Sequence, residues 1–161
     1  MIEIRKYDDK YANSISNLII DNLYQINIKD HGKEIIDSIS NRFTADEIKK
    51  AFPKRTESLV AIDDSEVVGT ASIDRFKGDK TGKKFIVLTV FTRIDKHNLG
   101  VGTKMIKELE KIALNLEAKE IVIPSSIYAC DFYRKLGFEY EYLDGKKIQN
   151  EKKEYMLIKK Y

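Results

Sequence analysis

The stretch from Phe85 to Leu116 constrains the fold of this chain more than any other part. Phe85 to Phe91 is a short run of apolar and β-branched residues, which is typical of a buried strand. A polar loop follows and ends in Gly100-Val101-Gly102. Beyond the loop, apolar residues recur at helical spacing and form one stripe: Val101, Met105, Ile106, Leu109, Ile112, Ala113 and Leu116. The order strand, glycine loop, helix predicts an α/β unit.

The start of the predicted helix is suited to a phosphate ligand. Glycine lets the backbone turn tightly and approach a ligand closely, and the first N–H groups of a helix have no partner within it. The positive end of the helix dipole adds to this preference for anions. The Walker pattern does not fit, because Gly102 is followed by Thr103-Lys104. The dinucleotide pattern does not fit either, because its third glycine is missing.

The rest of the chain predicts a mixed sheet with helices on both faces. Upstream of the central strand we expect, in order, a strand at Ile2–Arg5, a helix with Ala12, Ile15, Leu18, Ile19 and Leu23 on one face, a less regular stretch at Tyr24–Gly32, a helix at Lys33–Phe43, a capping box at Thr44–Glu47, and a hairpin of Ser58–Ile62 with Val67–Ile73. Downstream we expect a strand at Ile121–Ile123, a short helix at Ser126–Leu136 ending at Gly137, and strands at Phe138–Leu143 and Glu154–Lys159. A helical crossover requires Ile121–Ile123 to run parallel to its predecessor.

Length and composition predict one domain, residues 1–161, with a substantial core. The net charge of +3 comes without a long basic block, so we do not expect nucleic-acid binding. The single cysteine, Cys130, excludes an internal disulfide and suits a reducing compartment. Two distant histidines and one cysteine give no zinc spacing, so no metal is expected. No long apolar run or signal segment is present, and we expect a cytoplasmic protein without membrane spans.

The loop before the helix resembles the acetyl-CoA signature of the GCN5-related N-acetyltransferases (GNAT family). That signature reads Gln/Arg-x-x-Gly-x-Gly/Ala and opens a helix after a strand. The corresponding residues here are His97-Asn98-Leu99-Gly100-Val101-Gly102. The chain departs from the pattern at His97, where the family has Gln or Arg. This departure affects one side-chain contact to the pyrophosphate and leaves the contacts of the backbone amides unchanged.

A second segment, Ser126 to Phe138, resembles the family pattern Asn-x-x-Ala-x-x-Phe/Leu-Tyr-x-x-x-Gly-Phe. Five residues are in register, and Ser126 occupies the position where Asn is common: Ala129, Phe132, Tyr133, Gly137 and Phe138. This segment follows the first motif by one helix and one strand, which is the order that the family requires. The resemblance covers residues 57 to 161 and is looser before them, where Asn27-x-x-Asp30-His31 is similar to Asn-x-x-Asp-Tyr of some small bacterial members.

The resemblance implies an α/β acyl-CoA N-acyltransferase (GNAT) fold, with a mixed, mostly antiparallel sheet and a splayed parallel strand pair. It implies an N-acetyltransferase that moves the acetyl group of acetyl-CoA to a primary amine by direct attack, as a monomer or homodimer. The acceptor is a small-molecule or protein amine. Two alternatives stay open: a CoA-binding regulatory or interaction protein of the same fold that has lost catalysis, and a transferase of another acyl group.

The same resemblance implies which residues act. Tyr133 would protonate the departing thiolate, although an aromatic on a short helix can also serve packing alone. No acid lies within Phe85–Phe91, so Asp74, Asp30, His31 or a backbone carbonyl with ordered water would act as the base. The cofactor contacts would come from Phe91, Thr92, Arg93, His97, Asn98, Leu99, Gly100, Val101, Gly102, Thr103, Ser126, Ala129 and Phe132, with Lys96, Lys104, Arg134 or Lys135 near the ribose phosphate. The acceptor pocket would include Asn27, Asp30, His31 and the hairpin around Tyr140 and Tyr142.

Overall fold

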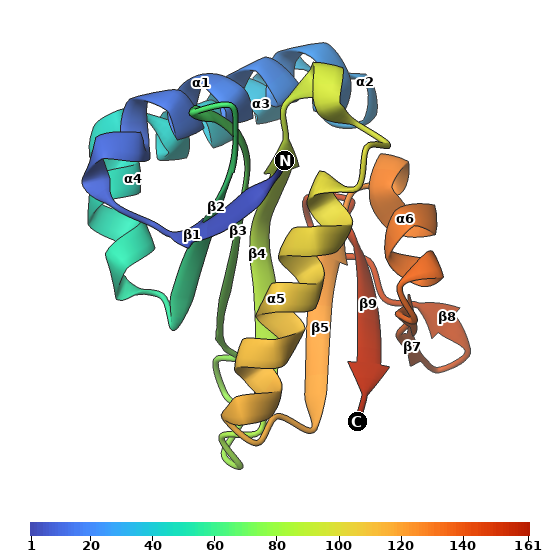
Figure 1. The fold of residues 1–161 in the computed structure, drawn as a ribbon. Coiled ribbons are helices and arrows are strands. Elements are labelled where there is room, and N and C mark those ends of the chain that lie inside the picture. Colours follow the sequence, from blue (N-terminus) through green and yellow to red (C-terminus); the bar gives the residue numbers. More distant parts are fainter.

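Seven strands form one sheet in the order β1-β2-β3-β4-β5-β9-β6 in the computed structural model, which describes residues 1–161 (Figure 1). These strands are β1 (Glu3–Lys6), β2 (Glu57–Asp63), β3 (Glu66–Arg75), β4 (Lys84–Thr92), β5 (Glu120–Ser125), β6 (Glu139–Tyr140) and β9 (Tyr155–Lys160). All neighbours are antiparallel except β4 and β5, which are parallel. A separate small hairpin joins β7 (Tyr142–Leu143) to β8 (Lys146–Lys147).

Helices cover both faces of this sheet. They are α1 (Ala12–Asn22), α2 (Ile28–His31), α3 (Lys33–Ser40), α4 (Ala45–Ala51), α5 (Val101–Asn115) and α6 (Cys130–Lys135). Figure 1 shows α5 lying in front of β4 and β5, with α6 beside it. Leu59 and Ala61 of β2 pack into the core beneath α5 and α6, whereas Val60 and Ile62 pack into a second core beneath α1, α3 and α4. Alternation along one strand therefore supplies both cores, and the predicted mixed sheet with two helical layers is confirmed.

Local sequence signals account for several boundaries of these elements. Thr44 caps α4, where its side chain accepts a hydrogen bond from the Glu47 backbone N–H at 3.3 Å. Gly137 follows α6 with φ of 98°, a conformation that glycine adopts without a steric cost. The hairpin of β2 and β3 turns at Asp64 and Ser65, which both have positive φ.

None of the helices combines the length and hydropathy that crossing a bilayer requires.

The stretch Tyr24–Gly32, expected to be less regular, is helical instead. A π-helical turn (Leu23–Asn27) continues α1 and leads directly into α2, which ends at Gly32 with φ of 81°. The wider π turn brings residues five apart onto one face, and Leu23 and Ile28 both pack against the core beneath α1. Tertiary packing thus extends the helix through a segment whose own polar and aromatic residues gave no helical stripe.

The two parallel strands separate along their length. Only Lys84–Ile86 of β4 pairs with Glu120–Val122 of β5, so the later part of β4 has no strand neighbour on that side. The register between β3 and β4 shifts opposite Thr70–Ser72, and Thr89 has φ of 56°, which is unusual for a β-branched residue. These are the features of a β-bulge, which bends a strand and increases its twist. The predicted splayed pair is confirmed, and it leaves a gap at the C-terminal ends of β4 and β5.

Candidate functional site

A cavity of about 660 Å³ lies at this gap. Its walls come from the end of β4, the following loop, the first turn of α5, the segment after β5, α6, and the end of α1 with its π turn. Thirteen of the residues that the sequence analysis assigned to the site line it: Asn27, Phe91, Thr92, His97, Asn98, Gly100, Val101, Gly102, Thr103, Ser126, Ala129, Phe132 and Tyr133. The two sequence motifs, which are about thirty residues apart in the chain, therefore meet in one cavity.

The glycine loop places the beginning of α5 at the cavity wall. Gly100, with φ of 86°, precedes the helix and provides no side-chain cap, so the first N–H groups of α5, which have no intrahelical partner, stay available to a ligand. A Cβ added at Gly102 would lie only 3.0 Å from Cζ of Phe132. Gly102 therefore lets α6 approach the first turn of α5 closely. This arrangement can hold an anionic group on backbone N–H donors at the positive end of a helix dipole.

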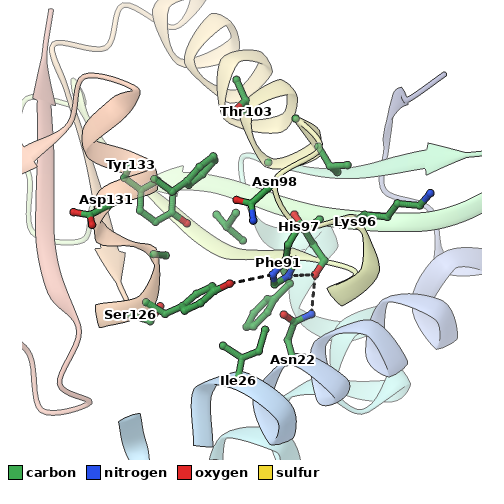
Figure 2. A pocket seen from close by; sticks show the side chains of 18 of the residues that line it. Asn22, Ile26, Phe91, Lys96, His97, Asn98, Thr103, Ser126, Asp131 and Tyr133 are labelled. Atoms are coloured by element: carbon green, nitrogen blue, oxygen red, sulfur yellow. Dashed lines mark hydrogen bonds between the residues drawn. The ribbon is translucent and has the colours of Figure 1, made fainter. Parts of the chain in front are cut away.

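Tyr133 presents its hydroxyl to the same cavity. Its ring packs edge-on against Phe132 and Phe138, with centroids 5.1 and 6.4 Å away. Figure 2 shows the hydroxyl pointing into the cavity. Burial raises the pKa of the Tyr133 hydroxyl above its usual value, and the Glu154 carboxylate adds to this effect. The hydroxyl is therefore protonated at neutral pH and can donate a proton to a group in the cavity.

The imidazole of His97 is turned toward the end of β4. Its Nε2 lies 2.8 Å from the carbonyl oxygen of Thr92, and Asn22 Nδ2 donates to the same oxygen at 2.9 Å (Figure 2). A carbonyl oxygen can only accept, so Nε2 of His97 carries the hydrogen. The other ring nitrogen, Nδ1, lies 3.5 Å from the hydroxyl of Tyr128. His97 thus connects the strand end to the opposite wall of the cavity.

The structure does not bring Asp74 to the cavity. Because β3 and β4 are antiparallel, Asp74 lies opposite Ile86, near the start of β4, whereas the cavity lies at the end of that strand. The Asp74 carboxylate accepts hydrogen bonds from the backbone N–H and hydroxyl of Thr56 at 3.2 and 3.0 Å, and from the Arg75 N–H at 2.9 Å. We therefore do not retain Asp74 as a base.

Four other expected site residues also lie outside the cavity lining: Arg93, Leu99, Asp30 and His31. Arg93 forms ion pairs with Glu66 and Asp95, and its N–H donates to Val68 of β3, away from the gap. The Leu99 side chain is exposed to solvent, and His31 is buried in α2, where its Nδ1 has no hydrogen-bond partner. Tyr140 and Tyr142 are absent from the lining as well.

The cavity also contains residues that the sequence analysis assigned no role or only an alternative one: Asn22, Ile26, Val90, Lys96, Tyr128, Asp131 and Lys135. Lys96 and Lys135 are two of the four alternatives that the sequence offered for the ribose phosphate. Figure 2 shows the Lys96 side chain directed away from the centre of the cavity, and its Nζ pairs with Asp63 at 3.7 Å. Asn22 belongs to no motif, and Tyr128 occupies an unspecified position of the second motif, so only the structure shows their contacts with Thr92 and His97. No group of three or more His, Cys, Asp or Glu side chains is arranged to hold a metal ion.

Comparisons with known proteins agree with this geometry. The model of the acetyltransferase (GNAT) family matches residues 20–138. The PaiA N-acetyltransferase of Thermoplasma acidophilum, solved in complex with coenzyme A, is 19% identical with a TM-score of 0.81, over 100% of this chain and 99% of that chain. A GNAT-family acetyltransferase of Staphylococcus aureus Mu50 is 17% identical with a TM-score of 0.76, over 99% of each chain.

Aminoglycoside 6′-acetyltransferase type Ii is 17% identical, with a TM-score of 0.71 over 98% of this chain and 96% of that chain. At these identities the solved structures show a shared fold. No curated protein is significantly similar to this chain in sequence.

Proposed function

Because this chain belongs to the acetyltransferase (GNAT) family, we propose that it transfers the acetyl group of acetyl-CoA to a primary amine by direct attack. The sheet with its splayed β4 and β5 is the predicted acyl-CoA N-acyltransferase fold. A coenzyme A complex of a protein with the same fold supports acetyl-CoA as the cosubstrate. We also propose that residues 1–161 act as one N-acetyltransferase domain, since the fold match extends over the whole chain.

One observation carries the proposal: the gap, the helix start and the Tyr133 hydroxyl all face a single cavity. The first turn of α5, Val101 to Thr103, would hold the pyrophosphate on its N–H groups. The edge of β4 around Val90, which has no strand neighbour on that side, would offer backbone groups to the amide-containing arm, as a neighbouring strand does. Phe132 and Ala129 would close the other side. The residues present therefore fit the cosubstrate.

Tyr133 would take the acid role. When bound, acetyl-CoA would supply the thioester carbonyl that the amine attacks; the new C–N bond replaces the C–S bond, and coenzyme A leaves as a thiolate. The Tyr133 hydroxyl would donate its proton to that sulfur, and its raised pKa keeps the proton in place beforehand. Of the side-chain bases that the sequence suggested, Asp74, Asp30 and His31, none lines the cavity. We propose that water, held by backbone carbonyl groups, takes the proton that the amine releases.

Two measurements test this function together. Calorimetry of purified protein with acetyl-CoA measures cofactor binding, and thiol release against a panel of amines measures transfer. Acetyl-CoA should bind, and at least one amine should release thiol faster with acetyl-CoA than with propionyl- or succinyl-CoA. Binding without transfer to any amine would favour the regulatory alternative. Faster release with another acyl group would replace acetyl in the proposal, and absence of CoA binding would refute it.

A further inference from the structure

A side-chain contact between Tyr128 and His97 joins the segment after β5 to the loop after β4, on opposite sides of the cavity. Tyr128 lies in a short helical turn (Ile127–Ala129) after β5, and His97 lies in the loop between β4 and α5. The Tyr128 hydroxyl is 3.5 Å from Nδ1 of His97, and the ring centroids are 6.2 Å apart. Both side chains line the cavity. The contact therefore spans the gap that opens between the C-terminal ends of β4 and β5.

The His97 side of this contact is fixed. Its Nε2–H donates to Thr92 at 2.8 Å, and the same carbonyl accepts from Asn22, which is buried at the end of α1. In the neutral ring this leaves the lone pair of Nδ1 to accept from the Tyr128 hydroxyl. Figure 2 shows these hydrogen bonds in sequence across the cavity. The ring orientation is thus set by the end of β4.

The Tyr128 side is free to move. Tyr128 is 60% exposed, and its hydroxyl has His97 as its only polar partner in the protein. A separation of 3.5 Å is at the outer limit of a hydrogen bond and is easily broken. An exposed aromatic side chain of this kind changes rotamer far faster than a helix or strand moves. The contact therefore joins a fixed side chain, His97, to a mobile one, Tyr128, which can move aside to open the cavity and return to cover it.

We propose that Tyr128 and His97 are positioning residues that close the cavity over the thioester arm of the cosubstrate and slow its release. This proposal rests on the proposed function, because it assumes that coenzyme A occupies the gap between β4 and β5. Tyr128 leaves His97 when the arm enters and returns once the arm lies along β4. Closure of this kind acts mainly on the rate of dissociation.

Tyr128→Phe tests the bridge with little risk to folding, because it removes one exposed hydroxyl and keeps the ring. The dissociation of coenzyme A is measured by stopped-flow displacement, and its Kd by calorimetry. We expect the dissociation rate and the Kd of coenzyme A to rise about two- to tenfold, which is the usual contribution of one hydrogen bond to affinity. KM for acetyl-CoA should rise more than kcat falls. Tyr142→Phe is the matched control, because Tyr142 is 58% exposed and lies outside the cavity, and it should leave both values unchanged.

A double-mutant cycle with His97→Ala separates a bridge from two independent contacts. If the residues act together, Tyr128→Phe should change release much less in the His97→Ala background than in the wild type. Fully additive effects, or wild-type release in Tyr128→Phe, would overturn the bridge while leaving the proposed function intact. A wild-type protein that binds no coenzyme A would overturn the proposed function and this proposal with it.

Discussion

The hydroxyl of Tyr133 is the atom whose removal tests the mechanism most directly. Tyr133→Phe deletes it and leaves the ring between Phe132 and Phe138. If the hydroxyl protonates the departing thiolate, the variant must rely on water for that proton. The substitution therefore separates the chemical role of Tyr133 from its role in the core.

The structure sets the size of each effect. The Tyr133 hydroxyl faces the cavity and has no hydrogen-bond partner in the protein, so its loss leaves no buried group unsatisfied. The free energy of unfolding should change by less than about 1 kcal/mol. General-acid transfer is commonly worth about a hundredfold or more, and a hundredfold loss of kcat corresponds to about 2.7 kcal/mol in the barrier. The Kd for acetyl-CoA should hold, because the proposed binding groups lie mainly on α5 and β4 and Tyr133→Phe changes neither.

The assay compares kcat, KM and Kd of wild type and variant with the same amine, and thermal unfolding checks the fold. Tyr155→Phe is the control, because Tyr155 also packs against the core but lies outside the cavity, and it should retain wild-type kcat. A loss confined to KM would mean that the Tyr133 hydroxyl only positions substrate. A Tyr133→Phe enzyme with wild-type kcat would refute the acid role altogether.

The pH profile gives an independent check. The acid works in its protonated form, so its contribution is lost as pH rises through the pKa of Tyr133. Burial raises that pKa above the usual value of about 10, so Tyr133 should cause no decline in kcat between pH 7 and 10. A decline near pH 8 or 9 in the wild type that disappears in Tyr133→Phe would contradict the raised pKa.

Three further substitutions test separate parts of the structure. Gly102→Val places a β-branched side chain where even a single added Cβ would lie 3.0 Å from Cζ of Phe132, so we expect a loss of CoA affinity of about tenfold or more, measured by calorimetry on folded protein. Asn22→Ala removes the hydrogen bond to Thr92 from a buried side chain, and chemical denaturation should show a loss of about 1–2 kcal/mol. Thr44→Ala removes the cap of α4 and should cost about 1 kcal/mol without affecting CoA binding, and a cost near zero would contradict the capping assignment.

The sequence determined the features that depend on neighbouring residues. The strand at Phe85–Phe91, the glycines of the loop and the apolar stripe of α5 are local patterns, and each corresponds to one conformation of the backbone. A helical crossover has to join parallel strands, so the pairing of β4 with β5 followed from the order of the elements. The two motifs identified the family for the same reason, because each is a short segment with its own spacing.

Which side chains share the cavity depends on contacts between distant parts of the chain. Asp74 looked suitable as a base, but the antiparallel register of β3 carries it to the far end of β4. Asn22 belongs to no motif, yet packing of α1 against the sheet brings its amide to a carbonyl seventy residues away. Tyr128 and His97 meet because β4 and β5 diverge by an amount that no local pattern encodes. Strand register, helix packing and the bulge at Thr89 set these distances, and all three arise from contacts between residues far apart in the chain.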